Sequence, residues 1–205
     1  MPAVPTKGNL MAAKKSLELS STGYELLDRK RNILIREMMS MIDAASQLQA
    51  EINSTYTSAY EALQKANTTL GMCDDLAQAV PVDDSLQISF RSVMGVELPT
   101  VTLASEDEAN RLSYGLNSSN SMLDEAFLRF QQVKALTARL AEVENSVYRL
   151  ADAIKRTQKR ANALKNILIP KFEEEVKFIS DALDEKEREE FARLKVIKQM
   201  KNSGN

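Results

Sequence analysis

Few side chains of this sequence have the chemistry that a catalytic or metal site needs. Histidine is absent, which removes the commonest general base, the usual partner of a serine or cysteine nucleophile, and the commonest transition-metal ligand. The single cysteine, Cys73, excludes an intrachain disulfide and a cysteine-based zinc site. No glycine-rich phosphate loop or other catalytic signature occurs. Catalysis by carboxylates alone stays open, but the residue types favour a protein that is no enzyme and has no cofactor or metal site.

The charged residues are the remaining candidates for function. Every residue from 184 to 190 is charged, and basic side chains surround Phe191 and Leu194 beyond this run. The simplest interpretation is a solvated helix end. The formal net charge of -2 predicts no general attraction to nucleic acid or anionic lipid. No apolar run approaches the roughly 20 residues of a membrane span, and the N-terminus lacks a signal-peptide core. We therefore expect a cytosolic protein without membrane insertion.

Two long segments carry apolar residues at alternating steps of three and four. This spacing puts them on one narrow face of a helix, and such a helix needs a partner with a matching face. We call these residues the seam and predict that the two segments pair through it. Its members are Leu17, Leu27, Leu34, Met41 and Leu48 in the first segment, and Leu136, Leu140, Val143, Val147, Leu150, Ile154, Leu164 and Leu168 in the second.

The seam predicts a mainly α fold, a long antiparallel two-helix coiled coil with a short middle region that contains a β-hairpin. The expected N-terminal coiled-coil helix covers residues 6–79, the hairpin and loop region 80–117, and the C-terminal coiled-coil helix 118–201. Thr6 is the expected N-cap. The seam repeats a four-residue step near Ile52 and again near Leu168, and Pro170 predicts a kink in the second helix.

The middle region has the pattern of a β-hairpin. Leu86, Ile88 and Phe90 alternate with polar residues, and the bend is expected at or before Gly95. Because an isolated hairpin is marginal in water, it should lie on the helices or on a partner. A second apolar stripe beside the seam also needs a third element, either the hairpin or a separate subunit. The candidate partner face therefore consists of Leu86, Ile88, Phe90, Phe127 and Phe130.

Both ends of the chain resemble the D subunit of V-type and archaeal-type (A-type) rotary ATPases, and the resemblance spans the chain. The residues that carry it near the N-terminus are Pro5-Thr6, Leu10, Lys14-Lys15, Leu17, Gly23, Leu26-Leu27, Lys30-Arg31 and Leu34. Those that carry it farther along are Tyr114-Gly115, Arg160, Asn162-Ala163-Leu164, Ile169-Pro170, Ile179, Leu183, Glu187-Arg188, Arg193-Leu194 and Lys198.

The resemblance implies a non-catalytic central-stalk subunit, the rotor shaft of the ATPase. In that family ATP is hydrolysed or made in a hexamer of catalytic and regulatory subunits, and the shaft couples this reaction to proton or sodium ion transport through a membrane ring. The paired termini enter the bore of the hexamer. The middle binds the small F subunit of the stalk and the subunit that links to the ring. The expected location is the cytoplasmic face of the membrane, as a peripheral part of the complex.

The resemblance also suggests which charged residues contact the bore of the hexamer, because a rotating end needs weak polar contacts. These candidates are Lys14, Lys15, Arg188, Arg193, Lys195 and Lys198; solvation alone is the other interpretation. Four alternatives to the rotor stay open. They are a prefoldin-like coiled-coil chaperone, the gamma shaft of F-type ATPases, a generic structural coiled coil and an enzyme.

Overall fold

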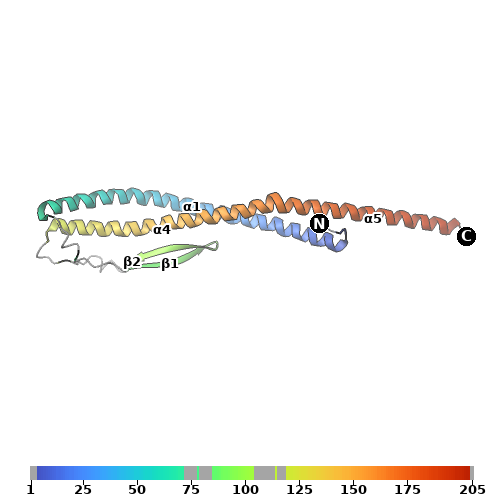
Figure 1. Ribbon diagram of the computed structural model, residues 1–205, viewed down its shortest axis with the longest axis horizontal. Coiled ribbons are helices and arrows are strands. Elements are labelled where there is room, and N and C mark those ends of the chain that lie inside the picture. Colours follow the sequence, from blue (N-terminus) through green and yellow to red (C-terminus); the bar gives the residue numbers. More distant parts are fainter. Residues whose placement is uncertain (1–3, 72–77, 79–84, 104–113, 115–118, 204–205) are drawn as a thin grey trace. The chain divides into compact units, whose positions relative to one another are not determined.

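The structure is a computed structural model that describes residues 4–71, 78, 85–103, 114 and 119–203 (Figure 1). Two long helices pack together, and a two-stranded antiparallel hairpin lies between them in the sequence, which confirms the predicted fold class. The elements in chain order are α1 (Lys7–Leu70), β1 (Leu86–Val93), β2 (Val96–Leu103), α4 (Ser121–Ala163), a π-helical turn η2 (Leu164–Leu168) and α5 (Ile169–Ser203).

Both ends of α1 have local causes. At the start, the hydroxyl oxygen of Thr6 accepts a hydrogen bond from the backbone N–H of Asn9 at 3.2 Å, which makes Thr6 the N-cap as expected. At the end, Gly71 has a φ of 80°, a left-handed conformation that glycine adopts readily and that stops a helix. The helix therefore ends at Leu70 and not at the expected residue 79. Most of the expected extension, residues 72–77 and 79, lies outside the described residues.

The chain divides into two compact units. The first unit contains residues 1–32 and 155–205. In it the two helical segments run antiparallel, because Lys7 contacts Glu187 and Arg31 contacts Gln158. Ile179 of α5 is fully buried, so the apolar contact continues into α5.

The second unit, residues 33–154, has two small cores. In the first, Leu34 of α1, Leu98 of β2 and Leu150 of α4 are all fully buried and pack together. Because each comes from a different element, this core attaches the hairpin to both helices. The second core consists of Ala66, Tyr114 and Leu123, with Leu70 and Phe127 packed against it.

The hairpin has a two-residue turn. Val93 of β1 pairs with Val96 of β2, so Met94 and Gly95 form the connection. Both have positive φ, 51° and 75° respectively, as in the type I′ turns that match the twist of a hairpin. The bend expected at or before Gly95 is therefore where the alternation and the glycine predicted it.

The irregularity near Pro170 takes the form of the π-helical turn η2. The N–H of Ile169 donates to the carbonyl of Leu164, five residues back instead of four. Pro170 explains this widening, because its ring would clash with the carbonyl four residues before it. The turn inserts one residue, so Leu164 and Phe172 are eight residues apart instead of the seven of a regular repeat. One consequence is that Leu168, expected in the seam, is 37% exposed.

Candidate functional site

The described residues contain no cluster of metal-ligating side chains. Nowhere among them do three or more His, Cys, Asp or Glu side chains gather in a way that could hold a metal ion. The same part of the chain includes no helix long and apolar enough to cross a bilayer. The candidate sites are therefore surfaces that the fold leaves open, together with the contacts that hold them in place.

The predicted seam residues lie mostly inside the helical pairs. Leu34 and Leu150 are fully buried, and the other residues except Leu168 are partly buried. Those partly buried residues are Leu17, Leu27, Met41, Leu48, Leu136, Leu140, Val143, Val147, Ile154 and Leu164. Leu168 is exposed because the extra residue of η2 shifts it away from the buried face of the helix. That face resumes at Phe172 and Ile179.

The outer strand of the hairpin presents an apolar strip. Leu86, Ile88 and Phe90 are 47%, 58% and 58% exposed, and they alternate along β1, so their side chains lie on one face. Their cross-strand partners on β2 are less exposed; Pro99, opposite Phe90, is buried. Three of the five residues of the candidate partner face thus form one exposed surface, which we call the β1 strip.

The other two residues of the candidate partner face are used inside the chain. The ring of Phe127 meets Tyr114 edge-on, with centroids 5.5 Å apart. The ring of Phe130 meets Tyr60 in the same way, also at 5.5 Å. Sequence reasoning placed Phe127 and Phe130 on one face with the β1 strip. Both side chains are partly buried, and their place in a partner face stays a prediction.

Polar contacts from α4 hold the hairpin in place. The carboxylate of Glu142 accepts a hydrogen bond from the backbone N–H of Val101 at 2.9 Å. The guanidinium of Arg149 donates to the carbonyl of Glu97 at 3.1 Å and lies 5.4 Å from the centroid of the Phe90 ring. A charged acceptor and a cation over a ring strengthen such contacts relative to neutral ones.

A further contact comes from α1. The guanidinium of Arg91 lies 3.1 Å from the carboxylate of Glu37. Sequence reasoning missed this contact and those of Glu142 and Arg149. In the sequence, the helical residues Glu37, Glu142 and Arg149 are charged positions beside the seam like many others. Nothing in their spacing indicated contact with a strand.

Tyr114 and Asn120 secure the start of α4. The hydroxyl of buried Tyr114 donates to the carboxylate of Asp124 at 2.8 Å. Burial raises the pKa of Tyr114 above its ordinary value, and the hydrogen bond and negative charge of Asp124 raise it further. Asn120 accepts from the N–H of Leu123 at 3.0 Å and donates to the hydroxyl of Thr69 at 2.7 Å. It therefore caps α4 and ties it to the end of α1.

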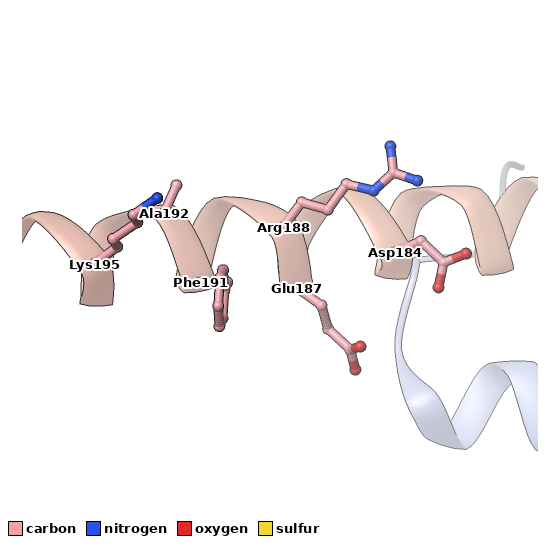
Figure 2. A pocket seen from close by; sticks show the side chains of 6 residues that line it. All are labelled: Asp184, Glu187, Arg188, Phe191, Ala192 and Lys195. Atoms are coloured by element: carbon pink, nitrogen blue, oxygen red, sulfur yellow. The ribbon is translucent and has the colours of Figure 1, made fainter.

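The last part of α5 is a second open surface. Every residue from Asp184 to Lys201 is exposed, including Phe191, Leu194 and Ile197 at 72%, 64% and 59%. Figure 2 shows part of this segment, where six side chains along α5 line a shallow groove. Those six are Asp184, Glu187, Arg188, Phe191, Ala192 and Lys195.

The six charged residues expected to contact a hexamer bore are all exposed. Two lie near the start of α1, and four lie in the open part of α5. They are Lys14 and Lys15 on α1, and Arg188, Arg193, Lys195 and Lys198 on α5. Of these, Arg193 has a loose ion pair with Glu189 on its own helix, at 3.6 Å. All six are available to an external partner or to water.

Comparison with known proteins gives a consistent result. The family model described as the ATP synthase D subunit matches residues 9–199. The D subunit of the V-type ATP synthase of Thermotoga neapolitana is 45% identical over 201 residues, which cover 97% of this chain and 98% of the relative. The D subunit of the A-type ATP synthase of Thermococcus kodakarensis is 37% identical over 95% of this chain and 92% of the relative. That of Methanopyrus kandleri is 34% identical over 96% and 85%.

Proposed function

Because the chain belongs to the D-subunit family of V-type and A-type ATP synthases, we propose that it is the non-catalytic rotor shaft of the central stalk. In this role it couples ATP hydrolysis or synthesis in a catalytic hexamer to proton or sodium ion transport through a membrane ring. The observation that carries the proposal is this membership together with a buried helical pair whose α5 continues into an open, charged segment. Every observation that fits a prefoldin-like chaperone fits the shaft equally well.

A shaft must transmit torque, and the buried contacts of the helical pair support this role. Leu34, Leu150 and Ile179 are fully buried, and interlocked side chains resist sliding of one helix past the other. The side chain of Arg31 adds a hydrogen bond of 2.8 Å to Gln158 across the pair. Two helices joined in this way resist torsion better than one helix alone.

A rotor must also be asymmetric to put equivalent sites into different states in turn. The π-helical turn η2 before Pro170 supplies a local cause, because it interrupts one helix and leaves α1 regular. Opposite this turn, a Cβ added at Gly23 of α1 would lie 3.7 Å from Leu164, an ordinary contact. The irregularity therefore belongs to the second helix alone.

Different surfaces of the chain would meet different partners. The exposed charges of α1 and α5 are the proposed contacts with the bore of the hexamer, because exposed ion pairs are weak and let a surface slide. The β1 strip is the proposed contact for the small F subunit of the stalk or for the subunit that links to the membrane ring. Its three apolar side chains are exposed although Leu98 on the opposite face of the hairpin is buried. The chain would then lie at the cytoplasmic face of the membrane as a peripheral part of the complex.

Purification of the tagged full-length chain from native membranes tests this function. We expect recovery of the hexamer subunits with ATPase activity, whereas the isolated chain has none. Neutralising Arg188, Lys195 and Lys198 to glutamine should weaken assembly or coupling, because all three are exposed on the open part of α5. Recovery of unfolded client proteins without hexamer subunits would contradict the proposal.

A matched control neutralises three exposed bases on other parts of the helices, Arg36, Lys65 and Arg139. This control removes the same charge but leaves α5 intact, so assembly and coupling should stay normal. Equal behaviour of the two triple variants would mean that the charges of α5 serve solvation only.

A further inference from the structure

The open part of α5 consists of two blocks of opposite charge. Residues 184–190 contain five carboxylates against two bases, a net charge of -3. Residues 191–201 contain the four bases Arg193, Lys195, Lys198 and Lys201 and no acid, a net charge of +4. Phe191, Leu194 and Ile197, at spacings of three residues, lie at and just beyond the boundary between the blocks. The segment thus has an acidic first part and a second part in which apolar side chains are interspersed with bases.

Among the described residues of its own unit, no helix covers this segment beyond the first residue of α1. The ammonium group of Lys7, the first residue of α1, pairs with Glu187 at 3.1 Å, where both side chains are largely exposed. Beyond this pair α5 continues to Ser203, with Phe191 72% exposed and Leu194 64% exposed. An amphipathic helix with an exposed apolar centre gains free energy when a matching helix covers it.

The charge order selects the partner. Parallel pairing of two such segments would place acid against acid and base against base. Antiparallel pairing about an axis near Leu194 places Glu190 and Glu187 of each copy opposite Lys198 and Lys201 of the other, with apolar side chains between them. Arg193 and Lys195 face each other beside the axis, so the opposite-charge pairs lie toward the two ends of the paired segment. This surface is complementary to itself, which is what an interface with two-fold symmetry requires.

We propose that the free chain forms a dimer through antiparallel pairing of this segment with the same segment of a second copy. The two-fold axis passes close to Leu194. Glu190 of each copy then lies opposite Lys198 of the other, and Phe191 lies opposite Ile197. The occupant of the open surface is therefore a second copy of this chain when no other partner is bound.

The dimer has a consequence for assembly, which rests on the proposed function. The paired segment contains Arg188, Arg193, Lys195 and Lys198, four of the six proposed bore contacts. A chain paired in this way has no free α5 end, so dimerisation and entry into the hexamer exclude each other. The dimer would protect the apolar residues of α5 before assembly.

Sedimentation velocity of the isolated full-length chain over a concentration series tests the proposal. Because exposed ion pairs are strongest at low ionic strength, the series is run in low and in physiological salt. We expect a reversible monomer–dimer equilibrium that salt weakens. Monomers at all concentrations in both buffers would overturn the proposal, and so would association that salt does not weaken.

Charge exchange at one pair tests the arrangement. Glu190→Lys and Lys198→Glu each put like charges opposite each other at two symmetric places, so each should weaken the dimer roughly tenfold to a hundredfold. An equimolar mixture of the two variants, or the double variant in one chain, restores both opposite-charge pairs and should restore dimerisation. Failure of the mixture and of the double variant to dimerise would refute antiparallel pairing at this register.

Two further variants separate pairing from general charge and from folding. Glu174→Lys changes the same charge at an exposed position on the earlier part of α5 and should leave the dimer intact. Leu194→Ser should abolish the dimer without unfolding the chain, because Leu194 is largely exposed in the monomer. A dimer that survives Leu194→Ser would place the interface elsewhere. Because no hexamer subunit takes part, the outcome is independent of the rotor function.

Discussion

Replacing Leu98 by alanine should release the hairpin while the helical pair stays folded. Leu98 is the fully buried residue of β2 that packs between Leu34 of α1 and Leu150 of α4. The β1 strand outside it is exposed along almost its whole length. Because a two-stranded hairpin is marginal alone, its attachment depends on this side chain and on a few polar contacts.

The expected magnitude follows from the burial. Leu98→Ala removes three buried carbon groups, about 2.4 kcal/mol at ~0.8 kcal/mol for each. The cavity left behind raises the range for such changes to about 2–5 kcal/mol. We expect the lower part of that range, about 2–3 kcal/mol, because an otherwise exposed hairpin can move toward the helices and close the cavity. The exposed Arg91–Glu37 pair contributes at most about 1 kcal/mol and does not compensate.

Hydrogen exchange of the backbone amides measures this effect. A change of about 2–3 kcal/mol raises the exchange rate of hairpin amides roughly 30-fold to 150-fold when exchange reports the opening equilibrium. Amides of the helices should change much less, because their hydrogen bonds lie within each helix. The matched control is Ile88→Ala on the β1 strip, which should have little effect because Ile88 is 58% exposed. Equal acceleration by both variants, or equal acceleration in hairpin and helices, would refute this account of the attachment.

Three other changes test separate parts of the structure. The free energy of unfolding should fall above about pH 10, because the pKa of Tyr114 is raised in the folded state and the unfolded chain therefore loses the phenol proton first. In chemical denaturation at several pH values, the Tyr114→Phe variant should not show this contribution to the decline. Deletion of Ile167 together with Pro170→Ala removes both the extra residue of the π-helical turn and the ring that forces it, and should leave the melting temperature unchanged or higher, whereas deletion of Lys159 rotates the following seam and should lower it. Asn120→Ala should lower the free energy of unfolding by about 0.5–2 kcal/mol, and Asn120→Asp should lower it less, because aspartate keeps the cap but loses the donor to Thr69.

The helices and the hairpin could be predicted because each depends on a local repeat. Burial on one helix face forces apolar residues into steps of three and four, as in Leu136, Leu140 and Val143. Likewise, apolar and polar residues alternate along β1, and Gly95, a residue type that readily adopts positive φ, marks the turn. Such signals need only the neighbouring sequence.

The remaining features depend on contacts between residues far apart in the sequence, or on local backbone conformations that the apolar repeat does not determine. The spacing across Leu168 and Pro170 predicted a stutter and a kink, but only the structure shows that a π-helical turn forms there and that Leu168 is exposed. The apolar spacing predicted a first helix as far as residue 79, but Gly71 takes a positive φ and α1 ends just before it. The roles of Glu142 and Arg149 depend on where the hairpin lies, which no periodicity encodes.

Equally, exposure decided which apolar residues remain available to partners. Phe127 and Phe130 are partly buried and contact the rings of Tyr114 and Tyr60 within the second unit. On the β1 strip, Ile88 and Phe90 are both 58% exposed, although Arg149 lies over the ring of Phe90. A sequence pattern identifies an apolar face but does not say whether the same chain covers it.

The most direct test of the rotor function is a reversible cross-link between the shaft and one hexamer subunit. Cysteine at Lys177, an exposed position of α5 beside buried Ile179, is suitable because unwinding of the open α5 end cannot relieve the link there. Cys73→Ser removes the natural thiol. ATP turnover of the assembled complex is then measured before oxidation, after oxidation and after reduction. The rotor account predicts loss of turnover on cross-linking and recovery on reduction; undiminished turnover with the shaft quantitatively cross-linked would contradict it.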